Sequence, residues 1–208
     1  WPLHDIGERY LFSVHSAEHL ILALVVPPLL LIGLNNEQKK LVVTERTLPI
    51  LTFFAKPFIA FSLFNFIIVC MHWSLIINLM VTNSIIHFVL HSIMLLASLN
   101  MWIPVIGLDH RIKQLSFPLR IGYLFIQSLL PTIPASFLAF STVPLYSAYL
   151  GVEQIYNISV INDQTLAGLV LKLGGGVILW VTILIIWMNW YKAEKKASDF
   201  EKSTRSDN

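Results

Sequence analysis

The sequence predicts an all-α polytopic membrane protein, a bundle of five spanning helices. Hydrophobic residues make up 56% of the 208 residues and charged residues only 12%, about half the charged share of a soluble domain. The mean hydropathy is +0.70. The apolar residues also gather in stretches long enough to cross a bilayer, which takes about 20 residues. These observations make the lipid bilayer the first expected partner.

Three candidate spans come before residue 108. The first covers residues 16–34, and the second covers residues 48–71. The apolar region that follows is too long for one straight span. We therefore expect a short surface or re-entrant helix over residues 74–82, and then a third span over residues 83–107.

Two further spans are expected in the second half of the chain. They cover residues 119–140, with Pro131 and Pro134 inside, and residues 166–191. Prolines inside spans are tolerated where neighbouring helices satisfy the backbone, and they usually mark kinks. We expect a kink in the fourth span for this reason.

The chain divides by composition into two parts. Residues 1–191 form a single transmembrane helical domain, and residues 192–208 are a charged tail that is expected to fray into disorder. Within the last span, Lys172 must reach the interface or pair with an acid, because a buried charge is costly in a membrane. Asp163 is the candidate partner, only a few helical turns away.

Lysine and arginine set the expected orientation of the spans. The loop after the first span, the loop after the third span and the tail carry the basic residues Lys39, Lys40, Arg46, Arg111, Lys113, Arg120, Lys192, Lys195, Lys196, Lys202 and Arg205. The connection 71–74 and the loop 141–164 carry none, and only Arg9 breaks the alternation. We therefore expect the N-terminus and the loop 141–164 outside and the C-terminus in the cytoplasm.

Two copies of one histidine spacing suggest the chemistry. The pairs His15/His19 and His87/His91 each stand four residues apart in or beside an apolar stretch. On a helix such residues share a face, with Cβ atoms about 5–6 Å apart, so each pair can hold one metal ion. His72 lies between the second and third spans. Polar side chains at membrane depth usually serve a function, which predicts a metal or cofactor site.

The expected orientation places all five of these histidines on the outer side. His110 falls on the cytoplasmic side, and His110 and His4 are expected to be ordinary interfacial residues. Imidazole with nearby sulfur suits copper, particularly Cu(I). The sulfur candidates are Met71, Met94, Met101 and Cys70, although methionine within a span is more often ordinary packing.

Composition also excludes several classes of site and partner. Cys70 is the only cysteine, so an intrachain disulfide and a multi-cysteine zinc site are excluded. The formal net charge is only +2, which gives a nucleic-acid partner no electrostatic support. No nucleophilic triad, Walker loop or paired catalytic carboxylate is visible. The sequence therefore favours a binding protein over an enzyme.

The order and spacing of several short motifs resemble a known family. The motifs are Trp1-Pro2-Leu3-His4-Asp5, Tyr10-Leu11-Phe12-Ser13-Val14-His15-Ser16-Ala17-Glu18-His19, Pro27-Pro28, His72-Trp73, Asn83 with His87 and His91, Met101-Trp102-Ile103-Pro104, Pro144-Leu145-Tyr146, and Asp163-Gln164 with Ala167-Gly168. Together they resemble the CtaG-like cytochrome c oxidase assembly factors over residues 1–187. No single motif is specific, but their order is.

The resemblance implies a multi-pass protein of the bacterial plasma (inner) membrane that is needed to make active cytochrome c oxidase. It further implies oxidase subunits as partners and a role in binding or delivering copper at the outer face. Family members usually have about seven spans, so two spans are expected to be missing upstream. The candidate metal ligands carried over by position are His15, His19, His72, His87, His91 and Asp163.

The sequence departs from the family pattern beside both histidine pairs. Ser16 and Leu20 stand where the family usually has methionine after each histidine of the first pair. Leu90 replaces an acid before the last histidine, and Leu171-Lys172 replaces a Met-Trp pair in the fifth span. The loss of methionines weakens the case for a soft copper site.

Two other functions use similar histidines. A membrane di-iron oxygenase of the desaturase type also carries HxxxH pairs, but it normally adds an HxxHH cluster and places its histidines on the cytosolic side. A b-type haem protein uses histidines on two helices as axial ligands. The absorption spectrum of the purified protein separates these alternatives, because only haem gives a Soret band.

Overall fold

The computed structural model describes residues 2–151 and 155–206, and within these ranges the regular structure is helical. Trp1 of the first motif and the end of the tail lie outside the described residues. In chain order the helices are α1 (Pro2–Arg9), α2 (Phe12–Leu20), α3 (Val26–Gly33), α4 (Asn36–Val42), α5 (Leu48–Phe54), α6 (Pro57–Met71), α7 (Ser74–Thr82), α8 (Ser84–Ile106), α9 (Phe117–Leu129), α10 (Thr132–Phe140), α11 (Val160–Leu169) and α12 (Gly175–Ser206). The all-α membrane bundle predicted from the sequence is confirmed.

Four helical stretches are long and apolar enough to cross a membrane. They are Phe12–Gly33, Ser84–Ile106, Phe117–Phe140 and Val160–Thr204. They agree with the predicted first, third, fourth and fifth spans, apart from shifted ends. The short helix expected over residues 74–82 is also present, as α7.

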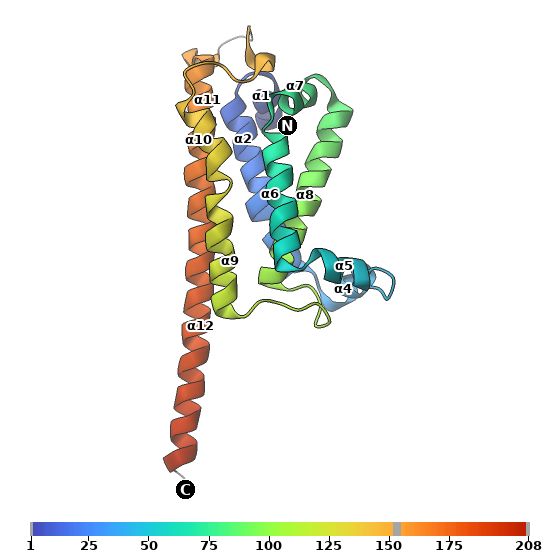
Figure 1. Cartoon of the computed structure of the whole chain (residues 1–208), viewed down its shortest axis with the longest axis vertical. Helices are drawn as coiled ribbons and strands as arrows, with labels where there is room; N and C mark the ends of the chain where they lie inside the picture. Colours follow the sequence, from blue (N-terminus) through green and yellow to red (C-terminus); the bar gives the residue numbers. More distant parts are fainter. Residues whose placement is uncertain (1, 152–154, 207–208) are drawn as a thin grey trace.

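The second predicted span is not one straight helix. Helices α5 and α6 meet at a bend of 73°, and Figure 1 shows α5 lying beside the lower end of the bundle, next to α4. The cause is local, because the proline ring makes the helical conformation unfavourable for the residue before it. Lys56 precedes Pro57 and has an extended ψ of 128°. Hydropathy alone does not reveal this break, because the residues on both sides of it are apolar.

Two spans contain a wider, π-helical turn. The turn η1 (Ile21–Val25) joins α2 to α3 just before Pro27, and η4 (Val170–Gly174) joins α11 to α12. Proline has no backbone N–H to donate to the preceding turn, so a change of hydrogen-bond register at η1 lets the helix continue. Such turns are frequent at functional sites, and η1 begins two residues after His19.

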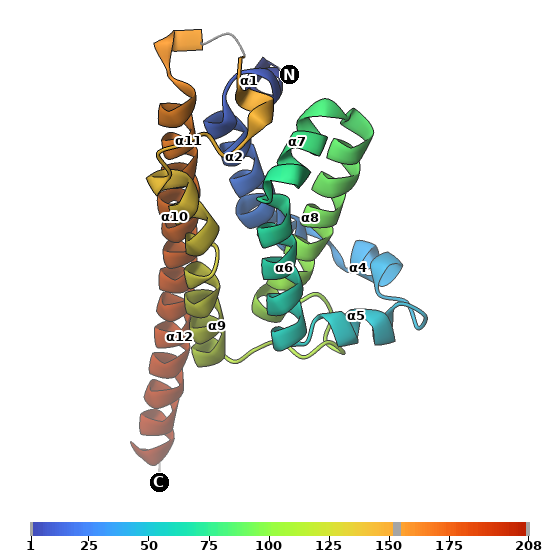
Figure 2. The same ribbon diagram turned by 45° about the horizontal axis from the view of Figure 1, so that its top comes forward.

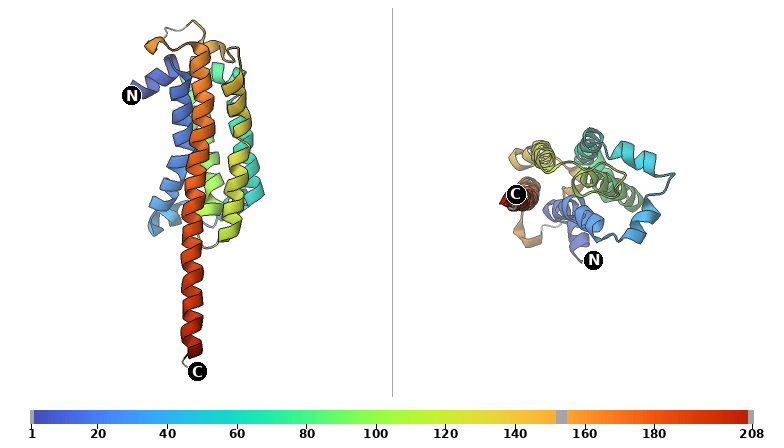
Figure 3. Two further views of the ribbon diagram at one scale, coloured as in Figure 1. Left: turned by 90° about the vertical axis from the view of Figure 1, so that its left-hand side faces the viewer. Right: turned by 90° about the horizontal axis from the view of Figure 1, so that it is seen from below.

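The tail contradicts the expectation of disorder. Helix α12 continues through Ser206, and Figure 3 shows it extending well past the other helices. Lys, Glu and Ala are good helix formers, and a pair four residues apart adds support, because Trp190 Nε1 donates to Glu194 Oε2 over 3.0 Å. The prediction was wrong because it weighed polarity above helix propensity.

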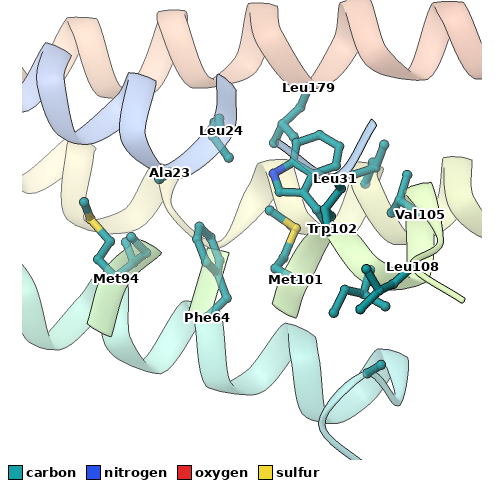
Figure 4. Packing of buried hydrophobic residues seen from close by; sticks show 14 of the residues in the cluster. Ala23, Leu24, Leu31, Phe64, Met94, Met101, Trp102, Val105, Leu108 and Leu179 are labelled. Carbon is teal, nitrogen blue, oxygen red and sulfur yellow. The ribbon is translucent and has the colours of Figure 1, made fainter. Parts of the chain in front are cut away.

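The main core lies at mid-depth, between α3, α6, α8 and α12. Figure 4 shows Trp102 packed among Leu31, Met101 and Leu179, all with almost no exposed surface. Met94 and Met101 are fully buried in this same cluster. Met71, which is 2% exposed, belongs to the same cluster, so all three methionines singled out as candidate sulfur ligands pack in the core.

Small residues allow a close contact between α10 and α11. A Cβ added to Gly168 of α11 would lie 2.5 Å from Ala139 N and 2.6 Å from Ala135 O of α10. No side chain fits there, so the glycine permits the two backbones to touch. This contact holds α11 against α10 and fixes where Asp163, one turn earlier, meets α2.

The two ends of the bundle differ in charge. Figure 1 shows α1, α7 and the segment after α10 at one end, and the connections after α3 and α8 at the other, where α12 also continues. At the second end Arg111 binds Asp109, Glu45 and the carbonyl of Val43. The hydrogen bonds from Arg111 lower the pKa of Asp109 to about 2. The basic residues of the connections after α3 and α8 thus share one end, as the sequence predicts, while Arg9 lies on α1 at the other end.

Candidate metal centre

The two histidine pairs face each other across the contact between α2 and α8. His15 and His19 are one turn apart with ring centroids 4.3 Å apart, and His87 and His91 repeat this at 4.2 Å. Across the helices, the ring centroids of His19 and His91 are 4.5 Å apart and those of His15 and His87 are 5.5 Å apart. We call these four residues the histidine cluster.

The histidine cluster is nearly sealed from the surface and short of hydrogen bonds. His15 has no exposed surface, and His19 and His87 are each 5% exposed. Neither ring nitrogen of His15 or His87 has a hydrogen bond of good geometry. Buried polar groups nearly always find a partner, so these imidazole nitrogens make the histidine cluster a candidate ligand site. A Leu at these positions would pack without the desolvation cost.

Helix starts hold the two pairs in place. Asn83 caps α8 and accepts from the backbone N–H groups of Ile85 and Ile86, so His87 lies in the first turns of that helix. At the start of α2 no residue of α2 itself supplies a cap. Asp163 of α11 supplies it instead, accepting from Phe12 N over 2.6 Å, from Ser13 N over 3.1 Å, and from the Ser13 hydroxyl.

This capping role gives Asp163 a different place from the one expected. Both of its carboxylate oxygens are engaged at the N-terminus of α2, and among the described residues it joins no cluster of potential ligands. A carboxylate is favourable there because the helix N-terminus carries partial positive charge. Its role is therefore to position α2 and its histidines. The expected Asp163–Lys172 pair is also wrong, since Lys172 Nζ donates to Ser136 Oγ over 3.3 Å and lies over the ring of Phe140.

His72 borders the same cavity as His19. His72 caps the end of α6, and a cavity of about 60 Å³ borders both His19 and His72, together with Gln127 and Lys172. This volume holds a few water molecules. His72 Nδ1 donates to the Ile68 carbonyl over 2.7 Å, which leaves Nε2 as the lone-pair nitrogen. Burial lowers the pKa of His72, and the bond to Ile68 opposes this only in part, so the ring stays neutral.

The sequence interpretation missed three residues close to the histidine cluster. His4 and Glu8 lie on α1, and Glu18 lies between His15 and His19 on α2. His4 Nδ1 is 3.2 Å from Glu18 Oε2, and the rings of His4 and His87 are 5.4 Å apart. The i,i+4 spacing of His4 and Glu8 was a usable signal. It was overlooked because α1 is short and its fold back onto α2 is a tertiary contact.

The comparison with known families settles the class of protein. A family model described as the cytochrome c oxidase caa3 assembly factor (Caa3_CtaG) matches residues 1–193. The chain belongs to this family. The match covers every helix that carries a site residue. No curated protein and no solved structure matched the chain.

Membership in the caa3 assembly factor family has direct consequences for the interpretation. A cytochrome c oxidase assembly factor acts in the membrane with the oxidase it serves, which agrees with the spans described above. The family assignment does not itself explain the buried histidines. The histidine cluster lies on α2 and on the first turns of α8, and Figure 2 shows α2 and this part of α8 at the end of the bundle that carries α1 and α7.

Proposed function

We propose that this caa3 assembly factor binds a copper ion in the histidine cluster at the outer face of the bacterial plasma membrane and hands it to an oxidase subunit. The observation that carries the proposal is the gathering of four imidazoles that includes His15, whose two ring nitrogens are buried and have no hydrogen-bond partner. One ligand nitrogen each from His15, His87 and His91 lies within 4.8 Å of the others. Three nitrogens around one ion, each about 2.0–2.1 Å from it, need only a small closure.

The fourth member of the cluster supports the same ion. His19 Nε2 lies 2.8 Å from His91 Nε2, so a small rotation of either ring turns both lone pairs toward a shared cation. His72 borders the cavity next to His19 and offers its free Nε2 as a further donor. A bound ion would then exchange one histidine ligand for another while it stays inside the bundle.

The donor set agrees with copper without requiring sulfur. Imidazole nitrogens bind both common oxidation states of copper and also zinc. Among the described residues, neither possible donor group includes Cys70. The sequence-based preference for Cu(I) depended partly on sulfur ligands, and the donor groups in the structure offer imidazole and carboxylate instead. Copper is favoured over zinc here because oxidases are copper enzymes and the chain is an oxidase assembly factor.

The charges at the two ends support the proposed outer location. The basic loops lie at the end opposite the histidine cluster, and such loops face the cytoplasm in bacterial membrane proteins. The proposed action is exchange of a bound ion with a partner rather than catalysis.

A spectrum and an elemental analysis of purified protein test the proposal. One copper per chain without a Soret band supports it. Copper content should fall in His15→Ala and His91→Ala proteins and stay unchanged in His110→Ala, whose side chain is 88% exposed at the other end. A Soret band or stoichiometric iron would point to the haem or di-iron alternatives. The close packing of the four rings already disfavours a porphyrin between α2 and α8.

A further inference from the structure

A second group of possible ligands adjoins the histidine cluster. His4, Glu8 and His87 each offer a ligand atom, and these atoms lie within 4.8 Å of one another. His4 Nε2 is 3.6 Å from Glu8 Oε1, and Glu8 Oε1 contacts His87 Nδ1. We call these three residues the outer triad. It contains a carboxylate, whereas the histidine cluster contains only imidazoles.

The outer triad and the histidine cluster share His87. An imidazole has two ligand nitrogens on different sides of its ring, and Nδ1 of His87 faces Glu8. Exposure falls steadily along the series. The side chains of His4, Glu8 and His87 are 42%, 27% and 6% exposed, and His15 has no exposed surface. One path of donors therefore leads from the surface to the buried histidines.

The structure holds α1 firmly over this path. Gly7 allows the close approach, since a Cβ there would lie 3.0 Å from His15 N. Tyr149, from the segment after α10, donates from its hydroxyl to the Gly7 carbonyl over 3.0 Å. Burial raises the pKa of Tyr149, so the hydroxyl keeps its proton. Figure 2 shows that segment beside α1 and α2. Helix α2 and the segment after α10 thus hold α1, with His4 and Glu8, in place.

We infer that the outer triad is a loading site, which takes a copper ion from the outside and passes it through His87 to the histidine cluster. The inference rests on the proposed function. Transfer is stepwise ligand exchange: rotation of the His87 ring, which holds the ion through Nδ1, carries it from His4 and Glu8 to His15 and His91, and each coordinate bond that breaks is replaced by a new one. No electron is transferred and no covalent bond breaks. The Glu8 carboxylate, with Glu18 nearby, attracts the cation at the mouth.

A loading site controls the rate of metal entry more than the final affinity. Cu(I) held by the chromophoric chelator bicinchoninate is offered to purified protein in detergent, and transfer is followed by the loss of chelator colour. In Glu8→Gln and His4→Ala proteins, loading should be at least about tenfold slower, with release slowed in proportion and the dissociation constant within about twofold of wild type. Glu37→Gln and His110→Ala, at the opposite end, are the matched controls.

The possible results separate the two proposals. Wild-type loading rates in both α1 variants, with an affinity that still depends on His91, would refute the loading site and leave the proposed function intact. A large loss of affinity without a slower loading rate would also refute it, because Glu8 would then belong to the final site. If wild-type protein takes no copper from the chelator, the proposed function fails first.

A second measurement isolates the outer triad. In the His15→Ala/His91→Ala double variant the histidine cluster is broken while the outer triad remains. This protein should bind less copper than wild type but still give a Cu(II) electron paramagnetic resonance signal with mixed nitrogen and oxygen ligands, because the outer triad is intact. Adding Glu8→Gln should abolish that signal. A folded double variant, judged by its helical circular dichroism, that binds no Cu(II) would overturn the inference.

Discussion

The Nε2 atoms of His19 and His91 lie 2.8 Å apart, although the two residues are on different spans and 72 positions apart in the sequence. Two neutral imidazoles at this distance need one proton between them, so one ring donates and the other accepts. A cation between the two lone pairs satisfies both rings as well. The observed arrangement of the two rings is therefore stable without a metal ion, and only a small ring rotation is needed for both rings to bind one.

Removing a histidine from the cluster should reduce oxidase assembly without loss of the protein. In His91→Ala, cells should contain less active cytochrome c oxidase, while the amount of this protein in the membrane stays near normal. Added copper should restore part of the activity, because mass action offsets weaker binding. His110→Ala should behave as wild type. Full oxidase activity in a His87→Ala/His91→Ala protein would leave only a scaffolding role.

The orientation can be tested by cysteine labelling in a Cys70→Ala background. Ser147 is exposed at the end with the histidine cluster, and Ser203 is exposed on α12 beyond the opposite end. A membrane-impermeant maleimide should label Ser147→Cys in intact cells and label Ser203→Cys only after the cells are opened. The reverse pattern would place the histidine cluster at the cytoplasmic face and contradict delivery from outside.

Asp163 should matter for stability more than for metal chemistry. In Asp163→Asn the side chain keeps one acceptor oxygen where the carboxylate offers two, while Phe12 N, Ser13 N and the Ser13 hydroxyl all need an acceptor. We expect a loss of about 1–3 kcal/mol, seen as a lower unfolding temperature and faster amide exchange at Phe12 and Ser13. Asp199→Asn, on the exposed tail helix, is the control. Unchanged exchange at α2 would show that the cap is dispensable.

Two glycines in the last span should respond in opposite ways to alanine. Gly168→Ala should destabilise the protein, because the new methyl group meets the α10 backbone at 2.5 Å. Gly176→Ala meets nothing within 4 Å and should be neutral or slightly stabilising, since alanine favours helix by about 1 kcal/mol over glycine. Thermal unfolding in one detergent compares them. Equal unfolding temperatures would mean that α11 does not pack on α10 this closely.

The spans and the histidine pairs could be predicted from the sequence because both depend on local patterns. Hydropathy over about 20 residues finds a span, and a spacing of four puts two histidines on one helical face. That the faces of α2 and α8 meet could not be derived, because many helix arrangements satisfy the same hydropathy. The prediction that the five histidines lie on the outer side of the membrane excludes some helix arrangements, but it does not single out one of them.

The errors have physical causes of the same kind. The Lys56–Pro57 bend is a backbone effect that hydropathy does not measure, and the helical tail reflects propensity rather than polarity. The family resemblance implied Asp163 as a ligand, and its hydrogen bonds to the start of α2 are a tertiary contact that no motif predicts. The outer triad was missed because α1 supplies His4 and Glu8 only after folding back onto α2.

The central claim is that buried imidazoles from α2 and α8 hold one copper ion together. X-ray absorption at the copper edge of protein loaded with one Cu(I) tests it most directly. The account predicts a first shell of nitrogen at about 2.0 Å with the outer scattering of at least three imidazole rings, reduced in His15→Ala/His91→Ala. A sulfur shell at about 2.3 Å, or a spectrum unchanged by the double substitution, would contradict it.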